Sequence, residues 1–148
     1  MKQLFRQTIF MVLAIVATSR AAQAQDLDDA MERFASAWRR SDYKAIASLI
    51  ARDGASIETE AGRLGPLGSR QAAALLRVIF SERNTTQVRT RQFQGGRGGG
   101  TPQKAFAELL WTSVAPATTE SLRIVVFVEF VRESDDIWRV TRIRLLQP

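Results

Sequence analysis

The second half of the chain constrains the fold most, because it consists of four long runs in which apolar and polar residues alternate. The runs are Thr85–Gln94, Ala105–Ser113, Leu122–Arg132 and Ile137–Leu146. A period of two places alternate side chains on opposite faces of a β-strand. Turn-rich segments containing Gly, Pro, Ser or Asp join successive runs. The sequence therefore predicts a four-stranded antiparallel meander.

The run Leu122–Arg132 is apolar on both of its faces. One face carries Ile124, Val126, Val128 and Phe130, and the other carries Val125, Phe127 and Val131. Each apolar side chain contributes roughly 1.5–3 kcal/mol when it is buried. We therefore expect a central strand whose outer face is covered, either by a homodimer formed through the sheet or by other parts of the same chain.

Helical spacing dominates the segment before these strands. In Asp28–Arg40 the apolar residues recur at i, i+3, i+4 and i+7, which places them on one helical face. They are Met31, Phe34, Ala35 and Trp38. A second, short helix is predicted to follow, with Tyr43, Ile46, Ala47 and Ile50 on its face.

Three further segments complete the N-terminal half. Ala55–Glu60 is predicted to form a short strand, and Ala61–Gly68, with three glycines and Pro66, is predicted to be a loop. Arg70–Phe80 is predicted to form a third helix that Ser69 caps. The predicted fold class is α+β, with three N-terminal helices packed on a curved, mainly antiparallel sheet.

The N-terminus has the features of a secretory signal. Lys2 and Arg6 precede the apolar run Ile9–Ala17, and Ala22-Gln23-Ala24 supplies the small residues of a cleavage site. The apolar run has about half of the roughly 20 residues that a membrane-spanning helix needs. We expect residues 1–24 to be a signal peptide, with no transmembrane anchor. Residues 25–148 are then expected to form a single domain in the periplasm or outside the cell.

Composition narrows the chemistry. The chain has 21 Lys and Arg against 15 Asp and Glu, and loss of Lys2, Arg6 and Arg20 leaves 18 − 15 = +3. This charge is too small to predict a nucleic-acid partner. The chain contains no Cys and no His. It therefore lacks the preferred ligands of zinc and the bases of Ser/His or Cys/His nucleophiles, and we expect no metal and no cofactor.

The segment from Phe34 to Ile50, followed by Asp53-Gly54-Ala55-Ser56-Ile57, resembles the opening of the nuclear transport factor 2-like superfamily. The Gly65–Gln71 segment and the closing Trp138–Leu145 are similar to a branch of exported bacterial domains of unknown function. The resemblance implies a cone-shaped fold in which four long strands follow a third helix. Because this superfamily contains isomerases, hydrolases, dehydratases and non-catalytic binding domains, it implies no single function.

The resemblance also allows a residue-by-residue test for an isomerase site. The tyrosine of steroid-isomerase members falls on Phe34, and their aspartate falls on Thr59, so neither functional group is present. Dehydratase members depend on histidine, which this chain lacks. An epoxide-hydrolase arrangement needs two carboxylates and an arginine on facing strands; the available acids are Asp53, Glu58, Glu108 and Glu129.

We therefore expect an exported, non-catalytic binding or assembly domain with no catalytic residues. The alternative is a small exported enzyme of isomerase or hydrolase type that uses Tyr43, Asp53 or a strand carboxylate. The resemblance implies a cone-shaped cavity that holds a small apolar ligand or is filled by its own lining, Phe34, Trp38, Tyr43, Ile57, Leu76 and Trp111. Four strand arginines could face an anionic surface, and the alternative is a solvated outer sheet face: Arg89, Arg91, Arg142 and Arg144.

Overall fold

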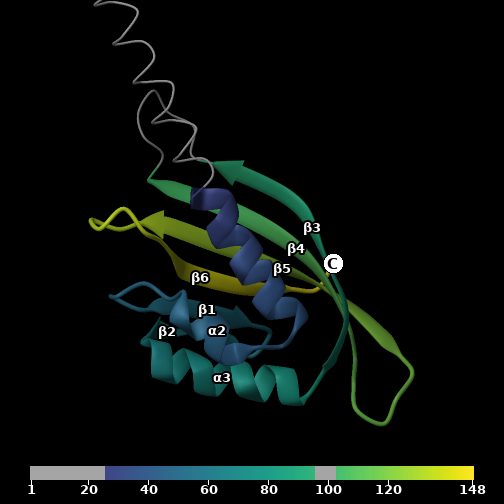
Figure 1. Ribbon diagram of the computed structural model, residues 1–148. Coiled ribbons are helices and arrows are strands. Elements are labelled where there is room, and N and C mark those ends of the chain that lie inside the picture. Colours follow the sequence, from purple (N-terminus) through teal and green to yellow (C-terminus); the bar gives the residue numbers. More distant parts are fainter. Residues whose placement is uncertain (1–25, 96–102) are drawn as a thin grey trace, which may run out of the picture.

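The computed structural model describes residues 26–95 and 103–148 (Figure 1). An N-terminal helix, residues 26–39, opens this part of the chain. It is followed in order by α2 (Tyr43–Ser48), β1 (Ala55–Thr59), β2 (Gly62–Leu67), α3 (Ser69–Ser81), β3 (Asn84–Gly95), β4 (Lys104–Val114), β5 (Ser121–Arg132) and β6 (Trp138–Leu146).

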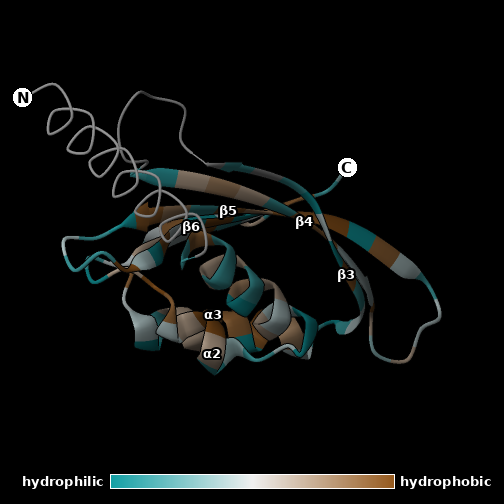
Figure 2. Cartoon of the chain, turned by 45° about the horizontal axis from the view of Figure 1, so that its top comes forward, coloured by the Kyte–Doolittle hydropathy of each residue, from teal (hydrophilic) through white to brown (hydrophobic). Residues whose placement is uncertain are grey.

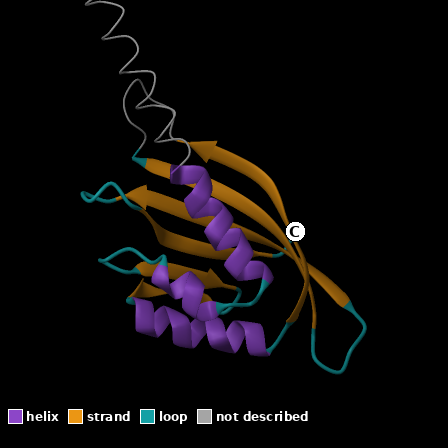
Figure 3. Ribbon diagram, in the orientation of Figure 1, coloured by secondary structure: helices purple, strands orange, loops and turns teal. Residues whose placement is uncertain are grey.

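The strands form one six-stranded sheet in the order β2-β1-β6-β5-β4-β3. Neighbouring strands are antiparallel, except that β1 runs parallel to β6. The sheet curves, and the helices lie on one of its faces (Figures 2 and 3). The N-terminal helix crosses the long strands, while α2 and α3 lie at the β1–β2 end (Figure 1). The predicted α+β class is confirmed.

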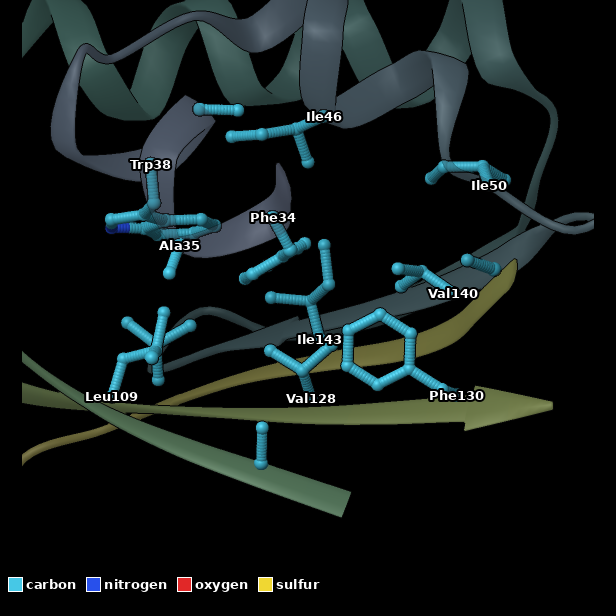
Figure 4. Packing of buried hydrophobic residues seen from close by; sticks show 14 of the residues in the cluster. Phe34, Ala35, Trp38, Ile46, Ile50, Leu109, Val128, Phe130, Val140 and Ile143 are labelled. Atoms are coloured by element: carbon cyan, nitrogen blue, oxygen red, sulfur yellow. The ribbon is translucent and has the colours of Figure 1, made fainter. Parts of the chain in front are cut away.

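The N-terminal helix contributes the largest side chains of the core. Phe34 and Trp38 are 1% and 0% exposed, and their rings stack with centroids 5.5 Å apart. Phe34 also meets Phe130 of β5 edge-to-face at 6.0 Å. Figure 4 shows both helix residues directed towards strand residues such as Leu109 and Val128. The helical spacing therefore identified the buried face correctly.

The meander β3–β4–β5–β6 also confirms the prediction from alternation. β5 lies between β4 and β6, and its core-facing Val126 and Val128 are fully buried. On the opposite face Val125 is 9% exposed and Phe127 is half-buried. This second apolar face lies on the side of the sheet without helices.

The predicted loop Ala61–Gly68 is wrong, because most of it forms strand β2, which pairs antiparallel with β1. The chain can be extended here because β2 is the edge strand of the sheet. Pro66 has no N–H to donate, and an edge strand tolerates this because its outer side has no partner strand. Gly65, at φ +133°, permits close pairing. A Cβ at this position would lie 2.8 Å from Ser56 Cα. Gly and Pro therefore mark an irregular edge strand in this segment.

The predicted cap of the third helix is also wrong. Gly68 is the N-cap of α3, and Ser69 is already helical. The Gln71 side chain accepts a hydrogen bond from the Gly68 N–H at 3.1 Å. Ser69 instead donates from Oγ to the Ala47 carbonyl at 2.7 Å, which ties α3 to α2. Ser69 therefore links α3 to α2. Because it lies one position after the N-cap Gly68, its side chain reaches the neighbouring helix α2.

The expected signal peptide, residues 1–24, lies outside the described residues, as does the glycine-rich stretch 96–102. Among the helices of the described residues, none has the length and apolar character that crossing a membrane requires.

Candidate functional site

A cavity of about 310 Å³ opens between the C-terminal half of α3, the turn between β1 and β2, and the concave face of the sheet. This volume is at the lower end of the range of about 300–1,000 Å³ that is typical of small-molecule sites. The lining residues are Thr59, Glu60, Ala61, Leu75, Val78, Ile79, Glu82, Arg83, Trp111, Ile124, Leu145 and Gln147.

Trp111 of β4 lies at the inner end of this cavity and is held rigidly. Its Nε1–H donates to Thr85 Oγ1 at 3.0 Å, and Thr85 Oγ1 also lies 2.9 Å from Ser41 Oγ. The ring meets Trp38 edge-to-face at 5.5 Å and Phe80 at 5.8 Å. Because the indole is fixed on several sides and is 0% exposed, it forms a rigid aromatic support beneath the exposed lining of the cavity.

The wall contributed by α3 is apolar. Ala72, Leu76 and Phe80 form the buried stripe of this helix. A neighbouring stripe of Leu75, Val78 and Ile79 lines the cavity. Val78 is 52% exposed, although valine is fully apolar. Helix α3 therefore uses one stripe to build the core and presents the other to the open space.

Charged side chains lie only in the outer part of the cavity. Glu60, in the turn between β1 and β2, and Glu82, the C-cap of α3, are both exposed, and Arg83 is half-buried. Within the described ranges, none of the three forms an ion pair. A ligand that enters the cavity would therefore pass the unpaired charges of the outer part before it reaches the apolar walls.

The six residues predicted to line a cavity are not brought together around this one. Trp111 lines it, whereas Phe34, Trp38, Ile57 and Leu76 are at most 1% exposed and fill the core. Tyr43 is half-buried and packs against the same core. The wall at Leu145 and Gln147 could not be predicted from the sequence, because it depends on how the end of β6 lies relative to α3. The apolar stripe Leu75, Val78 and Ile79 was the available signal.

Comparison with solved structures finds the same architecture in other proteins. A DUF4783 family protein from Bacteroides uniformis superposes with a TM-score of 0.65 at 11% identity, over 79% of this chain and 95% of that chain. A ketosteroid isomerase-like protein from Erwinia carotovora atroseptica gives 0.60 at 15% identity, over 81% and 92%. An M. tuberculosis LEH-like epoxide hydrolase gives 0.59 at 17% identity, over 84% and 79%.

This chain has the nuclear transport factor 2-like fold. No protein-family model matches the sequence, and no curated protein matches it either. Because these three structures are at most 17% identical to this chain, they establish the fold alone. Evidence for function must come from the side chains that this nuclear transport factor 2-like chain places around its own cavity.

One position singled out by the family resemblance does reach the cavity. Thr59, which stands where isomerase members carry an aspartate, is part of the lining, and its Oγ1 accepts a hydrogen bond from the Ala61 N–H at 3.2 Å. Phe34, at the tyrosine position, is buried away from it. Neither residue can transfer a proton near neutral pH.

The residues of the enzymatic alternative do not converge. Tyr43 begins α2, Asp53 is exposed in the following turn, and neither lines the cavity. Glu108 and Glu129 lie on the outer face of the sheet, paired in register with Phe127 and Phe106. The buried polar side chains among the described residues are Ser56 and Ser113, so no carboxylate in this part of the chain is fully removed from water.

The four strand arginines lie towards the outer face but do not form one strip. The strand register places Arg89, Arg142 and Arg144 on this face, with β4 and β5 between the first and the other two. Arg91 is the extra residue of a bulge between Thr90 and Gln92. Arg144 Nε lies 3.1 Å from Glu58 Oε2. Residues of β4 and β5 therefore separate Arg89 from Arg142 and Arg144. Arg144 is in an ion pair with Glu58.

Proposed function

We propose that this chain is an exported, non-catalytic binding domain that holds a small apolar ligand in the cavity at the end of α3. The observation that carries the proposal is the distribution of polarity: the apolar side chains of Leu75, Val78 and Ile79 form the wall, and the charged groups stand in the outer part. An enzyme of the isomerase or hydrolase type would need a carboxylate held out of water beside a donor. In this proposal residues 1–24 are removed on export, and residues 25–148 act as one domain.

Probe binding tests the proposal. N-phenylnaphthylamine, a neutral apolar dye, should bind the purified chain with one site and increase in fluorescence. Val78→Gln should weaken this binding, because it places an amide in the apolar wall. The fold should be retained, since Val78 is already half exposed and glutamine is a good helix former.

Ile137→Gln is the matched control, because Ile137 is 47% exposed but lies outside the cavity. It should leave dye binding unchanged. Equal loss of binding in both variants, or no binding by the parent chain, would overturn the proposal. Native mass spectrometry of the protein purified from the periplasm adds a direct search for a retained ligand, and its intact mass tests removal of residues 1–24.

We also propose that the domain assembles as a homodimer through the outer face of the sheet. This face carries an apolar band that no helix covers: Phe106, Leu110, Val125, Phe127 and Leu146. The Phe106 and Phe127 rings stack at 5.5 Å. Acidic and basic residues occupy the same face, with the basic residues in excess: Glu58, Glu108, Glu129, Arg89, Lys104, Arg123, Arg139, Arg142 and Arg144. A two-fold interface can bring each sign against the other, which makes the face suited to self-association.

A further inference from the structure

The charges in the outer part of the cavity do not balance. Two carboxylates, Glu60 and Glu82, stand there with a single guanidinium, Arg83. None of them is neutralised by an ion pair within residues 26–95 and 103–148. The opening therefore carries an excess of one negative charge, although the whole chain has a formal net charge of +6. A local excess opposite in sign to the rest of the molecule selects among ligands by charge.

The C-terminal end of α3 adds to this negative potential. The last turns of the helix supply Val78, Ile79 and Glu82 to the cavity. The carbonyl groups at a helix C-terminus carry about half a negative charge in total. Basic residues usually offset that charge, but the last turn of α3 contains none, and its C-cap is itself acidic. A cation at the mouth would meet both the carboxylates and the end of the helix.

We propose that the ligand is an amphiphilic cation: an apolar alkyl or aromatic body that lies against the α3 stripe of Leu75, Val78 and Ile79, with an amine or quaternary ammonium group near Glu60 and Glu82. This inference rests on the proposed binding function and names its ligand class. An anionic amphiphile would have Arg83 as its single favourable partner and would approach two carboxylates. A neutral ligand would gain the apolar contacts alone.

Three probes with the same apolar body separate these cases. Octyltrimethylammonium, octanol and octanoate are titrated below their micelle-forming concentrations, and affinities are measured by isothermal titration calorimetry. The expected order of affinity is cation, alcohol, anion. Each exposed carboxylate should contribute up to about fivefold to the preference for the cation. Because these charges are exposed, the preference should shrink as salt is added.

Charge variants locate the source of the preference. Glu60→Gln combined with Glu82→Gln should bring the affinity for the cation close to the affinity for the alcohol, with both affinities measured on the same variant. Glu120→Gln removes an equally exposed carboxylate from the connection between β4 and β5, away from the cavity, and should change neither affinity. Arg83→Gln should increase the preference for the cation.

The outcomes distinguish the two proposals. If all three probes bind with equal affinity, or if octanoate binds most tightly, the cavity binds apolar molecules but the cationic class is wrong. If none binds, the proposed function fails together with this inference. A cation preference that survives the double glutamine variant also overturns the inference, because the attraction would then arise elsewhere.

Discussion

At the scale of single residues, Trp38 and Trp111 are in contact with each other but differ in the hydrogen bonding of their indole Nε1 atoms. Trp111 Nε1 donates to Thr85 Oγ1, whereas Trp38 Nε1 is buried without a hydrogen-bond partner among the described residues. Both side chains are 0% exposed and their rings meet edge-to-face. A buried donor without a partner costs about 1–3 kcal/mol, whereas a satisfied one contributes about 1 kcal/mol.

Replacing each indole by phenylalanine tests this difference. Both Trp38→Phe and Trp111→Phe remove ring volume from the core and should lower the free energy of unfolding. Trp111→Phe should lower it by about 2–4 kcal/mol more, because it breaks a hydrogen bond whereas Trp38→Phe removes a buried donor that has no partner. Urea denaturation of the two variants measures the difference. An equal or larger loss in Trp38→Phe would show that its indole N–H has a partner.

At the scale of elements, β2 depends on glycine at positions of positive φ. Gly62 has φ +123° and Gly65 has φ +133°. A Cβ added at Gly62 would meet nothing within 4 Å, whereas one added at Gly65 would lie 2.8 Å from Ser56 Cα and 2.9 Å from the Ala55 carbonyl oxygen. A residue with a side chain would therefore have a strained backbone at either position, but its Cβ would also collide with β1 only at Gly65.

Alanine at each position separates strain from crowding. Gly62→Ala should cost about 1–3 kcal/mol, since an L-residue is strained there. Gly65→Ala should cost about 1–3 kcal/mol more, because the Cβ must also push β2 away from β1. Hydrogen exchange of the β1 and β2 amides, followed alongside thermal unfolding, should show faster exchange in Gly65→Ala. Identical stability of the two variants would mean that β2 does not pack against β1 as described.

The elements that the sequence predicted correctly are those whose periodicity spans many residues. The long β-forming run Leu122–Arg132, apolar on both faces, became the central strand β5, and the spacing of Phe34 and Trp38 reflects one buried helical face, so local pattern and tertiary structure agree. Strand β2 was missed because Pro66 and three glycines read locally as a loop. Only its partner β1 and its edge position make an extended conformation favourable.

At the scale of the whole molecule, the outer sheet face is the largest feature that the single chain leaves unexplained. The proposed homodimer would cover Phe106 and Phe127, and Phe127→Lys should abolish it by removing one ring of this stacked pair and placing a charge in the interface. Sedimentation analysis should then give a dimer for the parent chain and a monomer for the variant. Leu64→Lys, at a side chain 55% exposed on β2, should remain dimeric. A monomeric parent chain would contradict the proposal.

The candidate site also belongs to this scale, which explains why the sequence did not reveal it. Its lining comes from the turn after β1, the end of α3, two central strands and the end of β6. These segments lie far apart along the chain and meet only after the sheet has curved around the helices. The residues predicted to form a cavity were the largest apolar ones, and large apolar side chains are those that fill a core.

Methyl NMR during titration with N-phenylnaphthylamine decides whether the cavity at the end of α3 holds a ligand, because it reports which side chains the ligand touches. The methyl signals of Leu75, Val78, Ile79, Ile124 and Leu145 should shift together with increasing dye. Leu109, Val128 and Ile143, in the filled core, should not shift. Shifts centred instead on Leu110 and Val125 of the outer face, or an unchanged spectrum, would contradict a ligand site at the end of α3.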